Sequence, residues 1–150
     1  MKLPYQDATS GQNAINEIQK VLKAFGCTKF ATGEDFDSGE LFVQFQYHGR
    51  LVHLVADSKG YAAAWLKNNP WSSRRRCTQA DHERRALQIG SVAVYSVLRD
   101  WVKGQITAVE IGMMSFEGAF LSHMQLSNGK TVMDHVNEEK LLPATREEES

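Results

Sequence analysis

The sequence predicts an α+β fold: an N-terminal helix and a small antiparallel three-stranded sheet, then a helical C-terminal half with one long helix. Three observations predict it. Apolar residues recur at helical spacing near the N-terminus, alternate with polar residues in the next third, and return to helical spacing after residue 78. The chain has 150 residues, an ordinary length for one domain. We therefore expect a single domain over residues 1–142 and a disordered acidic tail over residues 143–150.

The first helix is expected over residues 11–25. Ser10 can cap its N-terminus, and Gly26 is a typical residue just past a helix end. A stripe of apolar residues marks its buried face: Ala14, Ile15, Ile18, Val21, Leu22 and Phe25. A short strand at residues 28–32 and a turn-rich acidic loop at residues 33–39 should follow.

Residues 40–56 predict a β-hairpin. Apolar and polar residues alternate along its first strand, and a His-Gly turn at residues 48–49 connects it to the second. Asp57 or Ser58 can cap a second helix. Pro70 should end that helix, because the residue before a proline is pushed out of the helical region.

The long helix should begin after Thr78 and run to about Lys103, with continuation to about Glu110. Its predicted core face consists of Leu87, Gly90, Val94, Val97, Leu98 and Trp101. Its predicted polar side consists of Asp81, Arg85, Gln88, Ser96, Arg99 and Lys103. Shorter helices are expected at residues 116–124 and 131–139.

The predicted order of helix, three strands and helix is similar to that of two nucleic-acid modules, the double-stranded-RNA-binding domain and the core of phage strand-annealing proteins. No diagnostic motif of either is present. The second helix opens with Ser58-Lys59-Gly60-Tyr61 and lacks the lysine cluster that a double-stranded-RNA binder needs there. A shared order of elements does not assign a function.

Charge is distributed unevenly along the chain. Residues 61–105 contain 8 Lys/Arg and 3 Asp/Glu, a net charge of +5, whereas residues 106–150 contain 3 Lys/Arg and 8 Asp/Glu, a net charge of −5. A basic middle segment suggests a surface that faces a polyanion. The alternative is that these charges are scattered over the folded surface and serve only solubility.

The most distinctive local feature is a run of three arginines directly after a tryptophan and two serines. Arginine presents a planar, always-charged fork of donors that suits phosphate, and tryptophan offers a face on which a base can stack. The sequence therefore predicts a nucleic-acid-binding site at these residues: Lys67, Trp71, Arg74, Arg75, Arg76, Arg85, Arg99 and Lys103. Alternatively, Trp71 packs into the core and the arginines pair with the acidic C-terminal third or with an acidic partner protein.

No catalytic or cofactor motif appears. The five histidines lack metal-ligand spacing, there is no glycine-rich phosphate loop, and Cys77 follows the arginines without an identifiable base. Acidic residues between Glu34 and Glu40 could hold a divalent cation, although their spacing does not match a calcium loop. We expect a non-enzymatic protein with no cofactor and no metal site, and an enzyme with an unrecognised site stays open as a third class.

Four segments resemble small uncharacterised proteins encoded by proteobacterial phages and prophages: residues 59–66, 99–110, 115–121 and 128–132. This resemblance implies a bacterial host cytoplasm and assigns no chemistry. The two isolated cysteines also fit a reducing compartment, and no apolar run approaches the roughly 18 residues of a membrane span. The expected partners are nucleic acid, a host or phage protein, and a further copy of the chain.

The function that these features favour is a phage-type nucleic-acid-binding protein that uses a basic arginine loop. The alternative is a protein–protein interaction module, such as an inhibitor of a host enzyme or defence factor.

Overall fold

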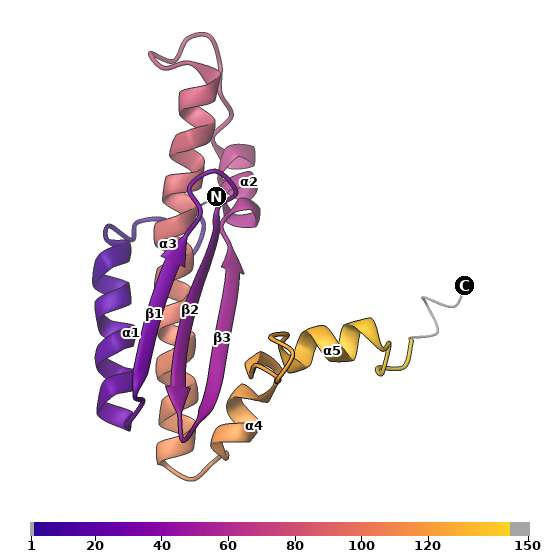
Figure 1. Cartoon of the computed structure of the whole chain (residues 1–150). Coiled ribbons are helices and arrows are strands. Elements are labelled where there is room, and N and C mark those ends of the chain that lie inside the picture. The colour runs from indigo at the N-terminus through magenta and orange to yellow at the C-terminus, as the bar shows by residue number, and fades with distance from the viewer. Residues whose placement is uncertain (1, 145–150) are drawn as a thin grey trace.

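The structure, a computed structural model, describes residues 2–144 and confirms the predicted fold class. Its elements, in chain order, are α1 (Gly11–Phe25), β1 (Lys29–Glu34), β2 (Glu40–Tyr47), β3 (Arg50–Asp57), α2 (Lys59–Asn68), α3 (Gln79–Glu110), α4 (Phe116–Phe120), the 3-10 helix η1 (Leu121–His123) and α5 (Val132–Glu138). An N-terminal helix and a sheet thus precede a helical half that contains one long helix (Figure 1). The predicted tail at residues 143–150 lies almost entirely outside the described residues.

The three strands form an antiparallel sheet in the order β1-β2-β3. Alternation along β2 and β3 turns one face inward, where Val43, Phe45, Val52 and Leu54 pack against α1, α3 and α4. The opposite face is less covered, and Val55 on it is 52% exposed. The sheet is therefore a half-buried layer that rests on helices on one side only.

Helix α2 packs against the N-terminal half of α3, where Ala62 and Trp65 meet Ala86. The two helices approach closely because α3 carries a glycine there. A Cβ atom at Gly90 would lie only 2.8 Å from the carbonyl oxygen of Ser58. In Figure 1 this part of α3 and the loop before it extend beyond the end of the sheet, with α2 beside them.

The predicted core face of α3 is partly wrong. Val97, expected in the core, is 43% exposed, whereas Ser96, expected on the polar side, is only 3% exposed. The cause is tertiary, because α3 contacts α1, α2 and α4 as well as the sheet, and no single arc is buried along its whole length. The Ser96 hydroxyl is satisfied locally, since it donates to the carbonyl oxygen of Val92 at 3.0 Å.

Several predicted boundaries shift by a few residues. Strand β1 extends to Glu34, because this residue still pairs with Leu41 in register. Helix α2 begins as expected, with the Asp57 carboxylate accepting from the Lys59 amide at 2.8 Å, while Ser58 makes no side-chain cap. The helix expected over residues 116–124 is divided into α4 and η1.

The chain after η1 leaves the body of the molecule. Met124 forms a single bridge to Val52 on β3, and the turn that follows leads into α5. No residue of α5 is buried, and Figure 1 shows this helix projecting away from the sheet. Within residues 2–144, no helix combines the length and the apolar character that crossing a bilayer requires.

Candidate nucleic-acid interface

The arginine run lies in the loop between α2 and α3, and the loop is closed by its own hydrogen bonds. The Trp71 indole N–H donates to the carbonyl oxygen of Cys77 at 2.9 Å. The Nε atom of Arg75 donates to the carbonyl oxygen of Pro70 at 3.2 Å. These two hydrogen bonds connect the start of the loop to its middle and its end, and they constrain the conformation of the segment that carries the arginines.

A buried histidine anchors the base of the loop. His82, on the first turns of α3, is 2% exposed and packs against the Trp65 ring, with 5.1 Å between ring centroids. Its Nε2 lies 2.6 Å from the carbonyl oxygen of Asn69, so Nε2 carries the proton at this contact. Sequence reasoning missed this residue, since an isolated histidine near a helix start carries no motif.

The three arginines are exposed, and none of them pairs with a carboxylate of the described residues. No Asp or Glu in residues 2–144 lies within ion-pair distance of Arg74, Arg75 or Arg76. Figure 1 shows that the acidic residues of α5 are distant from them, because the loop stands at one end of the molecule and α5 leaves the body near the other. The pairing that the sequence left open is therefore absent in the part of the chain that the structure describes.

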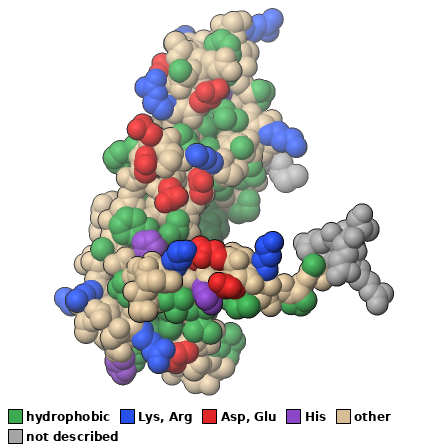
Figure 2. Space-filling view, turned by 45° about the vertical axis from the view of Figure 1, so that its right-hand side comes forward, with side chains coloured by type: hydrophobic (Ala, Val, Ile, Leu, Met, Phe, Trp, Pro, Cys, Tyr) green, Lys and Arg blue, Asp and Glu red, His purple; other side chains and the backbone are tan. Residues whose placement is uncertain are grey.

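Two more cations adjoin the loop. Lys67 lies in the last turn of α2 and Arg85 in the second turn of α3, and both are exposed with no ion pair among the described residues. Arg84 is different, since it pairs with Asp81 at 3.0 Å. We define the basic apex as Lys67, Arg74, Arg75, Arg76 and Arg85, and Figure 2 shows Lys and Arg side chains at this end of the molecule.

Trp71 is partly exposed and belongs to none of the apolar core clusters. Its indole nitrogen is used within the loop, so its ring is held at the loop base. The arrangement leaves part of the ring accessible beside the arginines. It does not support the alternative in which Trp71 fills the core.

Arg99 and Lys103 lie apart from the basic apex. They follow Arg85 by 14 residues or more on the same helix, which places them at least about 21 Å away along its axis. Both pair with Glu17 of α1, at 3.7 Å for Arg99 and 3.6 Å for Lys103. The structure thus does not bring all eight predicted site residues together.

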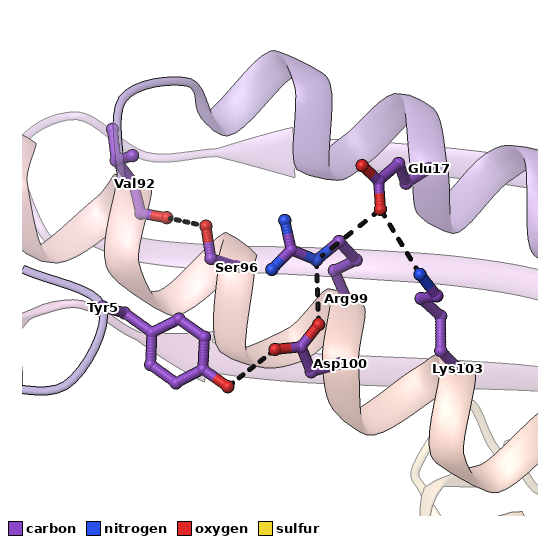
Figure 3. A network of polar contacts seen from close by, with 7 residues as sticks. All are labelled: Tyr5, Glu17, Val92, Ser96, Arg99, Asp100 and Lys103. Atoms are coloured by element: carbon purple, nitrogen blue, oxygen red, sulfur yellow. Dashed lines mark hydrogen bonds and ion pairs between the residues drawn. The ribbon is translucent and has the colours of Figure 1, made fainter. Parts of the chain in front are cut away.

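A second carboxylate completes this separate network (Figure 3). The Nε of Arg99 contacts Asp100 at 2.9 Å, and the Tyr5 hydroxyl donates to the same carboxylate at 2.7 Å. The hydrogen bond from Arg99 is the main cause that lowers the pKa of Asp100, and the hydrogen bond from Tyr5 is the next. The hydrogen bond to Asp100 in turn raises the pKa of Arg99. These cations are already neutralised and fasten α1 and the N-terminal segment to α3.

The other candidates from the sequence have structural roles. Glu34 faces α3 and accepts hydrogen bonds from the Ser91 and Tyr95 hydroxyls, and the Asp35 carboxylate caps two amides of its own loop. His53 contacts the Gln44 side chain at 2.9 Å. Within residues 2–144 no three His, Cys, Asp or Glu side chains gather as metal ligands would.

The two cysteines are expected to react at very different rates. Burial raises the pKa of the half-buried Cys27 to about 11, whereas Cys77 is exposed in the arginine loop. Because the thiolate is the reactive form, iodoacetamide at about pH 8 should alkylate Cys77 at least about tenfold faster than Cys27. Mass spectrometry of timed digests measures both rates. Equal rates in the folded protein would contradict the burial of Cys27.

Comparison with known proteins provides no relative. No family model matches the chain, and neither a curated protein nor a solved structure matches it. The resemblance to phage-encoded proteins and the similarity to nucleic-acid modules therefore stay predictions. The geometry of the basic apex is therefore the main evidence on what the protein does.

Proposed function

We propose that the protein is a non-enzymatic, phage-type nucleic-acid-binding protein whose basic apex contacts the phosphate backbone. The observation that carries the proposal is the exposure of Arg74, Arg75 and Arg76 on a closed loop without any carboxylate partner in the described chain. Arg84 and Arg99 differ from these three residues, because each pairs with a nearby carboxylate.

The loop geometry supports phosphate contact. Each guanidinium can donate two parallel hydrogen bonds to a phosphate, and a loop held by its own bonds loses less conformational entropy on binding. The loop also leads into the N-terminus of α3, where the helix dipole adds partial positive charge. Asp81 in the first turn offsets part of that charge, so the arginines are the main attraction.

Trp71 supports a contact with unpaired bases. A partly exposed indole next to phosphate-binding arginines is the combination by which single-stranded nucleic acids are held, because every base has a face that can stack. We therefore expect single strands to bind more tightly than duplexes. Arg99 and Lys103 are not included in the proposed interface, because both form ion pairs with Glu17 and Arg99 also pairs with Asp100.

Fluorescence anisotropy with labelled single-stranded and double-stranded DNA and RNA tests the proposal. Binding should be measured at about 50 and 200 mM salt, because counterion release makes phosphate contacts steeply salt-dependent. We expect binding at the lower salt that weakens strongly at the higher. Absence of binding to every probe at about 50 mM salt would overturn the proposal and direct attention to a protein partner.

Thiol protection locates the contact within the same protein. Bound nucleic acid should slow alkylation of Cys77, which directly follows the arginine run, and should leave the alkylation rate of Cys27 unchanged as an internal control. The protection should disappear at the higher salt. Binding that protects neither cysteine would place the interface elsewhere on the molecule.

A further inference from the structure

Strand β1 is an open edge of the sheet. It pairs with β2 on one side, and no other segment of residues 2–144 pairs with it. The opposite edge differs, because the Gln125 amide donates to the carbonyl oxygen of Leu51 on β3 at 2.8 Å. Figure 1 shows β1 at the margin of the sheet. The neighbouring α1 packs mainly against α3 and leaves the edge accessible, since Ala31 and Thr32 are exposed.

The register identifies the backbone groups of β1 that are unpaired. The Asp35 amide donates to the carbonyl oxygen of Glu40 at 2.8 Å, and bonded pairs alternate along an antiparallel ladder. Alternate residues of β1 therefore bond to β2, whereas the amide and carbonyl groups of Phe30, Thr32 and Glu34 point away from it. These groups have no backbone partner within residues 2–144. They are free to bond to another strand.

The charged residues of β1 leave the middle of this edge unprotected. Edge strands that avoid pairing commonly carry a proline or a charge along their length. Strand β1 has no proline, and its charges lie at its ends, with Lys29 at the start and Glu34 and then Asp35 at the finish. Lys29 and Asp35 are exposed, and neither has an ion pair among the described residues. The edge is thus positive at one end and negative at the other.

This charge polarity favours an antiparallel copy of the same strand as the occupant of the edge. An axis at Thr32 uses every free backbone group, because Thr32 then faces its own copy and Phe30 faces the partner's Glu34. The same register places Lys29 opposite the partner's Asp35, and the twofold symmetry makes this pair twice. Opposite charges that face each other across two strands are stabilising, whereas a parallel copy would set like charges side by side. Charge and hydrogen bonding therefore select one register.

We propose that two copies of the chain pair through β1, antiparallel about a twofold axis at Thr32, so that their two sheets join into one. The contact surface is the same on both copies, and the assembly therefore closes at a dimer. Ala31 faces the partner's Gly33, and these small residues let the strands approach. The β1 edge includes no residue of the basic apex, so the proposal is independent of nucleic-acid binding.

Sedimentation velocity of the full chain, from about 1 to 300 µM protomer, tests the dimer. We expect wild type to dimerise within this range and Thr32→Pro to remain monomeric. Proline removes the amide at the axis, and it is tolerated on an edge strand because that amide makes no bond to β2. Circular dichroism should show that the variant is folded.

Val55→Pro is the matched control. Val55 is exposed on β3, and its amide also points away from β2, because alternate residues share the outward direction of the Leu51 carbonyl. The substitution therefore makes the equivalent backbone change on the opposite edge of the sheet. This variant should dimerise like wild type.

A charge exchange tests the register. Lys29→Glu places negative charge at both positions of the pair, and Asp35→Lys places positive charge at both, so each variant should be monomeric alone. Mixed in equal amounts, the two should dimerise, because each charge then faces its opposite at both ends of the joined strands. Recovery uses the same two proteins, so a local distortion in either one would not explain their failure to self-associate.

Net charge needs its own control. Asp35→Lys labelled with a fluorophore at the exposed Cys77 should enter a dimer with Lys29→Glu and much less with Lys20→Glu, which changes a lysine on α1. Equal recruitment by the two partners would refute the register. A wild type that remains monomeric at the highest concentration would refute the dimer. So would a dimer that Thr32→Pro does not weaken, or a mixture of the charge variants that stays monomeric.

Discussion

Phe120→Ala is expected to lower the free energy of unfolding by about 3–5 kcal/mol. Phe120 is fully buried and contacts Phe45 of β2 and Trp101 of α3 edge to face, with ring centroids 5.4 and 5.8 Å apart. Truncation removes these contacts and leaves a cavity where α4 joins the sheet to the long helix. Urea denaturation followed by circular dichroism measures the change as a lower midpoint at an unchanged slope.

Phe36→Ala is the matched control for this prediction. It makes the same chemical change at a side chain that is 83% exposed, and it should alter stability by no more than about 0.5 kcal/mol. If Phe120→Ala cost as little as the control, α4 would not belong to the folded core. A steeper or shallower slope would indicate that the substitution also changed the compactness of one state.

The parts of the fold that sequence predicted best are those with local chemical signals. The Ser10 side chain accepts a hydrogen bond from the Asn13 amide at 3.1 Å, and Gly26 adopts a positive φ of 114°. These two cap residues are therefore what allowed both ends of α1 to be predicted from the sequence. Thr131 forms a capping box with Asp134 at the start of α5. Such signals act over three or four residues and need no knowledge of the rest of the chain.

The buried surface of α3 could not be read in the same way. The helix has 32 residues and meets different neighbours along its length, and a single periodicity averages over them. Val97 follows the apolar period and is exposed, while Ser96 is buried and Tyr95 packs with Ala14 and Leu41, which are distant in sequence. Helical period predicts that a helix has a buried face, and packing decides which residues compose it.

In the candidate site, too, local features were predictable from the sequence and contacts between distant segments were not. The arginine run and its tryptophan were visible as composition, and the structure places them on one closed loop. The pairing of Arg99 and Lys103 with Glu17 could not be predicted from the sequence. It joins α1 to α3, and the three strands of the sheet lie between these helices along the chain. A net charge of +5 over residues 61–105 therefore overstates the charge available to a ligand.

Arg74→Ala/Arg75→Ala/Arg76→Ala is expected to weaken binding of single-stranded nucleic acid at least about 1000-fold at low salt, since each charge-assisted contact contributes about 1.5–3 kcal/mol and about 1.4 kcal/mol is tenfold in affinity. The salt dependence should fall as well. Loss of three phosphate contacts should reduce the slope of log affinity against log salt by about 2, at roughly 0.7 per contact on a single strand. Anisotropy titrations at four or more salt concentrations provide both quantities for each protein.

Lys20→Ala/Lys23→Ala/Lys29→Ala is the charge-matched control. It removes the same three positive charges from exposed positions on α1 and β1, far along the chain from the loop, and these lysines have no ion pair within residues 2–144. Its effect on affinity should be small and its salt slope close to that of wild type. If both triple variants lost affinity equally, net charge would account for the attraction and the arginine loop would have no special part. If only the arginine variant lost affinity while its salt slope stayed unchanged, the loop would act through contacts other than phosphate, and Trp71→Ala would then separate base stacking from hydrogen bonding by the guanidinium groups.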